Sequence, residues 1–142
     1  MDNLREKVND FLEENKLKYY KSNDEEDVYR ILLPYRHKEI KSITLFMDVY
    51  WKINMLKLGF HEEVNKVNID EVKTKLLDIN GRLVIGTLSL EKDSDIVTYS
   101  IDWVVGEEDN ILKETYNKNI VYSLNIYENL LKDNVIIQNK GI

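Results

Sequence analysis

Residues 96–105, IVTYSIDWVV, alternate between apolar and polar side chains. The odd positions carry Val, Tyr, Ile, Trp and Val, while the even positions from Thr98 to Asp102 are polar. A period of two sends these sets to opposite faces of a strand, so that one face is buried and the other is wet. A wet face is common in antiparallel sheets, whereas parallel sheets are covered on both sides. The run therefore predicts an antiparallel sheet.

Helical and extended patterns divide the rest of the chain. Pairs of strand-like runs are separated by single helix-like stretches, which favours an α+β fold over a doubly wound parallel sheet. We predict an antiparallel sheet of about five to six strands with three helices, in the order αββββαββα. The helices are predicted over residues 2–16, 68–79 and 110–131, and the strands over 17–21, 28–33, 42–50, 51–60, 82–90 and 96–105.

The length of the chain and its few glycine and proline residues indicate one domain. The chain has 142 residues with five glycines and a single proline, Pro34, so no flexible linker is apparent. We expect one α+β domain over residues 1–133 and a short C-terminal tail over residues 134–142. Pro34 is expected to end the hairpin that contains the first two strands.

Charge and cysteine content exclude several classes of function. The chain has 26 acidic and 20 basic residues and a net charge of −6, which disfavours binding to nucleic acid or to anionic lipid. It has no cysteine, which excludes disulfides, thiolate nucleophiles and cysteine-based metal sites. No signal peptide and no apolar run of membrane-spanning length is visible. We therefore expect a cytoplasmic protein with no nucleic-acid and no membrane partner.

The motifs of known chemistries are incomplete. HEEVN, residues 61–65, begins like the zinc-protease motif, but Asn65 stands where a second histidine is needed. Neither a GxSxG elbow nor a GxxxxGK[ST] phosphate loop occurs. Carboxylate pairs such as Glu62–Glu63 lie in polar runs, which predicts a solvated surface. We expect no catalytic residue, no metal site and no cofactor, and we interpret His61 as a polar loop residue.

The stretch INGRLVIGTLSL, residues 79–90, joins a predicted helix to a predicted strand. Dinucleotide-binding glycines have the reverse order, strand before helix. Asn80–Gly81 is therefore interpreted as a left-handed C-cap, and Arg82 as the start of the strand. On this interpretation Gly81→Ala lowers stability by about 1 kcal/mol. Gly86 lies inside the predicted strand, where glycine indicates a bulge or a close backbone contact.

Several segments together resemble one bacterial family. The order LKYYKSNDEEDVYRILLPY, ITLFMDVYWKINML and LLDINGRLVIGTLSLEKDSDIVTYSIDW, before a long closing helix, resembles the YbjN-domain family of sensory transduction regulators. Residues Leu76 to Trp103 carry most of the resemblance, and the tyrosine- and asparagine-rich closing helix departs from it. The resemblance implies a fold similar to that of type III secretion chaperones, self-association, and a chaperone-like or regulatory role through protein contacts. It supplies no catalytic residues.

The first functional hypothesis is a non-catalytic protein-interaction module. The apolar positions change parity within residues 49–60, which requires either a bulge or two apolar sheet faces. If the helices cover one face, an apolar patch on the other marks an interface. A second copy is the commonest partner, so we expect a homodimer, with another protein as the alternative. The candidate interface residues are Leu56, Leu58, Phe60, Val84, Leu88 and Leu90.

The alternative hypothesis is a small-molecule-sensing domain, or an enzyme with an unrecognised pocket. Such a site needs large side chains as walls and a converging polar group. Trp51, Tyr99 and Trp103 are the candidate walls, and Asp48 or Arg82 is the candidate polar group. The two hypotheses differ in what they require of the structure, because one needs an exposed interaction surface and the other a cavity.

Overall fold

The computed structural model describes residues 3–24, 27–37, 41–91, 95–106 and 109–137. It confirms the predicted α+β fold, with three helices and a six-stranded antiparallel sheet in the order αββββαββα. The helices are α1 (Asn3–Glu14), α2 (Ile69–Arg82) and α3 (Lys113–Lys132), and a short 3₁₀ helix, η1 (Lys66–Asn68), precedes α2. The strands are β1 (Tyr20–Asp24), β2 (Tyr29–His37), β3 (Lys41–Tyr50), β4 (Met55–Glu63), β5 (Thr87–Leu90) and β6 (Ile96–Val104).

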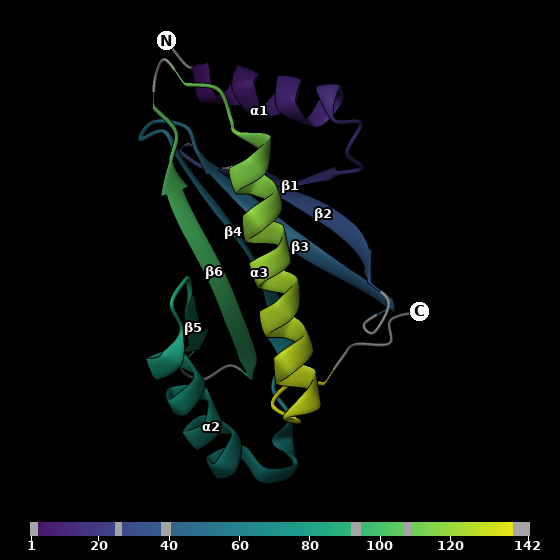
Figure 1. The fold of residues 1–142 in the computed structure, drawn as a ribbon, viewed down its shortest axis with the longest axis vertical. Coiled ribbons are helices and arrows are strands. Elements are labelled where there is room, and N and C mark those ends of the chain that lie inside the picture. Colours follow the sequence, from purple (N-terminus) through teal and green to yellow (C-terminus); the bar gives the residue numbers. More distant parts are fainter. Residues whose placement is uncertain (1–2, 25–26, 38–40, 92–94, 107–108, 138–142) are drawn as a thin grey trace.

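The sheet has the strand order β1-β2-β3-β4-β6-β5, and every neighbouring pair is antiparallel. α3 runs along one face of the sheet, and α1 crosses near one end of α3 (Figure 1). The ring of Phe11 in α1 meets that of Tyr116 in α3 edge to face at 4.9 Å, so both helices share that face. Leu76 of α2 and Leu88 of β5 join the same core. The opposite sheet face carries no helix in the described part of the chain.

Aromatic side chains fill the core between α3 and the sheet. The ring centroid of Phe60 lies 5.6 Å from that of Tyr99 and 5.0 Å from that of Tyr127. The hydroxyl of Tyr127 donates to Glu62 Oε2 over 2.6 Å, and that of Tyr99 donates to the Ile85 carbonyl over 2.7 Å. Burial raises the pKa of Tyr99 to about 12 and raises the pKa of Tyr127 as well. Both phenols therefore stay protonated and act as hydrogen-bond donors.

The change of parity near residue 50 is a hairpin turn. Residues 51–54, predicted as the start of a strand, form the turn between β3 and β4, and Asn54 adopts a left-handed φ of 51°. The turn brings Val49 opposite Leu56, so the apolar positions before and after it face the same side. Neither a bulge nor a second apolar face is needed here.

α2 extends beyond its predicted end at Ile79. It continues through Gly81 to Arg82, whose Nη2 donates to Asp78 Oδ2 over 2.7 Å within the last turn. Among the described glycines the left-handed φ, +86°, belongs to Gly86. The C-cap prediction for Gly81 is therefore wrong, and β5 begins five residues later than predicted, after Gly86.

Several further boundaries differ from the predictions. β4 continues to Glu63, so the interpretation of His61 as a loop residue is wrong and His61 lies in a strand. α3 begins at Lys113 and not at residue 110. β2 does not end at Pro34, which pairs with Thr44 of β3. β1 reaches only as far as Leu32, so Pro34 has a strand on one side alone. A strand tolerates the missing N–H of proline at such an edge position.

The first residues of the expected C-terminal tail pack on the domain. Val135 and Ile136 are buried, and Ile136 forms an isolated bridge with Val64. The N–H of Ile137 donates to the Glu63 carbonyl over 3.1 Å. Residues 138–142 lie outside the described part. Within that part, no helix combines the length and hydropathy needed to cross a membrane.

Candidate functional site at the edge of strand β6

Half of β6 has a neighbouring strand on one side only. β4 pairs with every residue of β6, whereas β5 pairs only with Val97–Ser100. Residues Ile101–Val104 therefore have no second strand partner in the described part of the chain. Figure 1 shows β5 beside one end of β6 and an open flank beside the other end.

Gly86 ends the pairing between β5 and β6. Its φ of +86° is in the left-handed region, which turns the chain before Thr87 out of the path of a strand. The preceding carbonyl, of Ile85, accepts the hydroxyl hydrogen bond of Tyr99. A Cβ on Gly86 would lie 2.5 Å from Tyr99 Oη, so only glycine allows this close approach. The contact between Gly86 and Tyr99 therefore sets the point at which β5 begins and the free edge of β6 starts.

The free edge presents unpaired peptide groups. The N–H of Val105 donates to the Asn54 carbonyl over 2.7 Å, so the peptide groups of Val105 face β4. Peptide groups alternate in direction along a strand, so those of Asp102 and Val104 face away from β4. No strand in the described residues receives them. Each of the two residues thus offers one donor and one acceptor to an incoming strand.

The two outer strands of the sheet are protected in ways that this edge is not. The outward N–H of Leu88 in β5 donates to Asn80 Oδ1 over 3.0 Å, so α2 blocks that edge. β1 is short, and its register shifts between Lys21 and Asp24. Bulges, lysines and covering elements are the usual protection against unwanted strand pairing. The free half of β6 has only the charge of Asp102.

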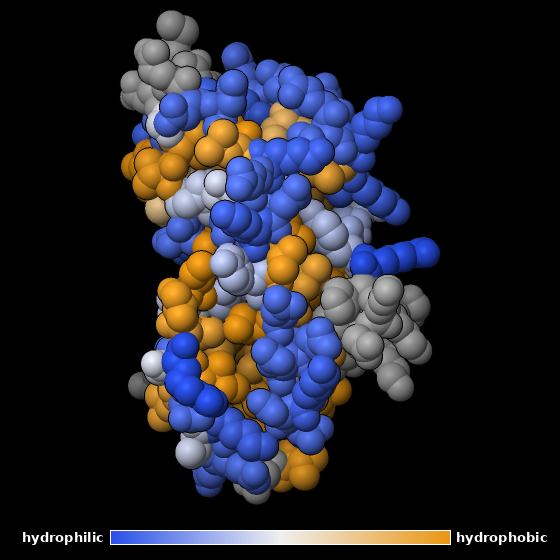
Figure 2. Space-filling model, viewed as in Figure 1, coloured by the Kyte–Doolittle hydropathy of each residue, from blue (hydrophilic) through white to orange (hydrophobic). Residues whose placement is uncertain are grey.

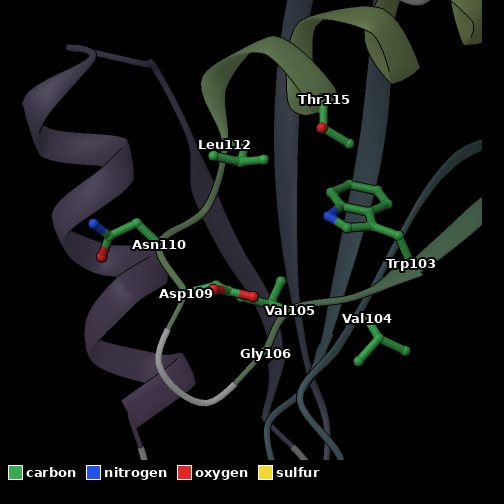
Figure 3. Close-up of a pocket in the computed structure, with 8 residues that line it drawn as sticks. All are labelled: Trp103, Val104, Val105, Gly106, Asp109, Asn110, Leu112 and Thr115. Carbon is green, nitrogen blue, oxygen red and sulfur yellow. The ribbon is translucent and has the colours of Figure 1, made fainter.

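Apolar side chains flank the free edge on both faces of the sheet. Val104 points to the uncovered face and is 72% exposed. Trp103 points to the helix face and lines a cavity of about 580 Å³. Figure 3 shows the cavity between the end of β6, the following loop and the first turn of α3. Its other walls include Val105, Gly106, Asp109, Leu112 and Thr115.

The six residues predicted to form an apolar interaction surface do not form one in a single chain. The hairpin turn after β3 gives the sheet one main apolar face, and the helices cover it. Leu90 is half-buried, and Val84, which precedes β5, is 95% exposed. The other four lie in the core, and they are Leu56, Leu58, Phe60 and Leu88.

The three predicted pocket walls are not brought together either. Trp51 lies in the turn between β3 and β4, and Tyr99 is fully buried in the core. Of the three, only Trp103 lines the cavity of about 580 Å³ at the end of β6. Neither candidate polar group reaches that cavity, since Asp48 lies on the uncovered face of the sheet and Arg82 ends α2.

A polar network lies on the uncovered face of the sheet. Arg30 forms a bidentate ion pair with Asp48, with Nε–Oδ1 and Nη2–Oδ2 distances of 2.7 and 3.0 Å. Its Nη1 lies 2.9 Å from His61 Nε2, and His61 Nδ1 lies 2.8 Å from Thr98 Oγ1. The imidazole also stacks on Phe46 at 4.5 Å. Arg30 and His61 together bury Phe46, which is 3% exposed although no helix covers it.

This network fixes the protonation of His61. Arginine can only donate, so His61 Nε2 accepts and Nδ1–H donates to Thr98. The ring is therefore neutral. Burial, and then the charge of Arg30, lower the pKa of His61 below its ordinary value. The hydrogen bonds at both ring nitrogens hold the imidazole against Phe46.

Neither the free edge nor this network was predicted from the sequence. The edge had one signal in the sequence, which is Gly86 inside the predicted strand 82–90, where glycine indicates a bulge or a close backbone contact. The network had none, because its members come from four strands. In the described residues no three metal-ligating side chains gather. The chain matches no protein-family model, no curated protein and no solved structure.

Proposed function

We propose that the protein is a non-catalytic protein-interaction module that forms a two-fold homodimer by pairing the free edges of β6. The observation that carries the proposal is the pair of outward-facing residues, Asp102 and Val104, on an edge that lacks the protection of the two outer strands. Addition of a strand satisfies such peptide groups with main-chain hydrogen bonds. Two-fold dimers are also the commonest assemblies of identical chains.

One register of self-pairing suits this edge. It places Trp103 opposite Trp103 of the partner subunit, and Asp102 opposite Val104 of the partner subunit. Two hydrogen-bonded residue pairs then form around the axis, each exchanging both N–H···O bonds. Residues facing each other lie on the same face of the sheet, as antiparallel pairing requires.

A neighbouring register is less favourable. Centring the axis on Asp102 places two carboxylates directly opposite each other, which is destabilising. It also directs Val104 toward Ser100 of the partner subunit, a position already paired with Thr87 of its own chain. A shift by a single residue would bring side chains from opposite faces together.

A chaperone-like or regulatory role is the second part of the proposal. It rests on the resemblance of the sequence to YbjN-domain proteins. A module that works through protein contacts needs an association surface and no reactive groups. The free edge of β6 fits that requirement, and the engaged ring nitrogens of His61 are consistent with it.

Sedimentation velocity tests the dimer with a matched pair of variants. Val104→Pro removes one outward N–H and leaves the bonds to β4 intact, whereas Val104→Thr keeps that N–H and the branched shape. We expect dimers at high micromolar concentration for the wild type and for Val104→Thr, and monomers for Val104→Pro with unchanged circular dichroism. A monomeric wild type, or a dimeric Val104→Pro, would falsify the proposal.

The register can be tested by cross-linking because the chain has no cysteine. In the proposed dimer the two Trp103 Cα atoms are about 4.5 Å apart, within disulfide range. The two Asp102 Cα atoms are offset by two residues and about 8 Å apart, which is too far. Trp103→Cys should therefore form a disulfide-linked dimer on oxidation and Asp102→Cys should not. The reverse pattern would assign a different register.

A further inference from the structure

The cavity beside β6 combines three kinds of side chain. The indole of Trp103, the carboxylate of Asp109 and the hydroxyl of Thr115 line it, with Val105 and Leu112 as aliphatic walls. In Figure 3 these side chains surround a common space, while Asn110 points away from it toward α1. The volume of about 580 Å³ is within the usual range of small-molecule sites.

The carboxylate of Asp109 is held in place by the loop backbone. The N–H of Asp109 donates to the Gly106 carbonyl over 3.0 Å, and Lys7 of α1 donates to the same carbonyl over 3.1 Å. The side chain folds over Gly106, where a Cβ would lie 2.4 Å from Asp109 Oδ2. Among the described residues no donor or cation is paired with this carboxylate. It is therefore a fixed negative charge on the cavity wall.

An indole beside an unpaired carboxylate is suited to an organic cation. The face of tryptophan attracts ammonium groups more strongly than any other side-chain ring, and the carboxylate adds an ion pair. The walls from Val105 and Leu112 favour a ligand with an apolar body. A metal ion is a poorer fit, because no three metal-ligating groups gather in the described residues.

We propose that the Trp103–Asp109 cavity binds a primary organic ammonium ion with a small apolar body. The ammonium group contacts the Trp103 ring, the Asp109 carboxylate and the Thr115 hydroxyl, and the apolar body lies against Leu112. The net charge of −6 attracts such a cation from a distance. The site adjoins the dimer contact, because Trp103 and Val104 line the cavity and also belong to the free edge of β6.

The first test compares two probes of equal shape. Isothermal titration with 2-phenylethylammonium should show saturable binding, and 2-phenylethanol, which lacks the charge, should bind about tenfold more weakly. The same titration at protein concentrations above and below the dimer range separates ligand binding from self-association. Absence of saturable binding, or equal affinity for the two probes, overturns the proposal.

The second test locates the charge. Asp109→Asn keeps the shape of the side chain and removes its charge. This variant should bind 2-phenylethylammonium about tenfold more weakly than the wild type. Asp70→Asn is the matched control, because Asp70 is an exposed carboxylate in the first turn of α2 and lines neither the cavity nor the free edge of β6. It should change the affinity less than about twofold, through long-range charge alone. Equal effects of the two variants would show that net charge, and not this cavity, attracts the probe.

Discussion

Gly81 and Gly86 lie five residues apart and have opposite backbone requirements. Gly81 is an ordinary residue of the last turn of α2, whereas Gly86 needs a left-handed φ and close contact with Tyr99. The Asn-Gly dipeptide indicated a helix end, as it often does. The side chain of Asn80 is used elsewhere, on the N–H of Leu88, and no local pattern could show that.

At the residue scale, Gly81→Ala should stabilise the protein by about 0.5–1 kcal/mol. A Cβ at this position meets no atom within 4 Å, and alanine reduces the entropy of the unfolded chain. The structure thus reverses the sign expected from the sequence. Urea unfolding gives the free energy directly.

Gly86→Ala serves as the opposite control. Its Cβ would lie 2.5 Å from Tyr99 Oη at a φ that alanine rarely adopts, so it should lower the free energy of unfolding. If the two variants change stability in the same direction, the assignment of the special backbone position to Gly86 is incorrect.

At the scale of elements, the edge of β5 depends on α2. Asn80→Ala removes the acceptor that covers the N–H of Leu88, whereas Asn80→Asp keeps an acceptor oxygen. We expect the alanine variant to lose about 0.5–1.5 kcal/mol of stability. Amide hydrogen exchange at Leu88 should accelerate in that variant and stay slow in the aspartate variant. Unchanged exchange in both would mean that α2 does not protect this edge.

Helices and strands with a regular pattern of apolar residues could be predicted from the sequence, whereas the boundaries between them could not. The alternation of β6 and the order of the helices and strands are confirmed, because each follows from burial on one face. The ends of α2 and β5, and the turn at residues 51–54, depend on partners distant in the sequence. The candidate site lies at such a junction, so the sequence pointed to Trp103 and not to the edge beside it.

For the molecule as a whole, the two faces of the sheet differ in how they are covered. Helices bury one face, and side chains alone bury the centre of the other. Asp48 is 7% exposed and Phe46 3% exposed beneath Arg30 and His61. Charged and polar side chains therefore bury the centre of the uncovered face. Because these side chains include a histidine, the stability of the protein should depend on pH.

Burial and Arg30 lower the pKa of His61 in the folded protein, whereas the unfolded chain keeps a pKa near 6.5. As the pH is lowered below 6.5, the unfolded state takes up a proton before the folded state does. The free energy of unfolding therefore decreases as the pH decreases, until the pKa of His61 in the folded protein is reached. Chemical unfolding of the wild type and of His61→Gln across this range measures the difference. The variant should lack this part of the pH dependence, and a parallel profile would contradict the neutral assignment.

The late position of β6 in the chain affects when the free edge can exist. β2, β3 and β4 are consecutive hairpins with close contacts along the sequence, whereas β6 reaches β4 only after α2 and β5. Local hairpins close with less loss of entropy than distant pairs. The meander should therefore form first on the folding pathway, and β6 should dock onto it afterwards. The free edge of β6 therefore exists only in the finished domain, so dimerisation through that edge must follow the docking of β6 onto β4.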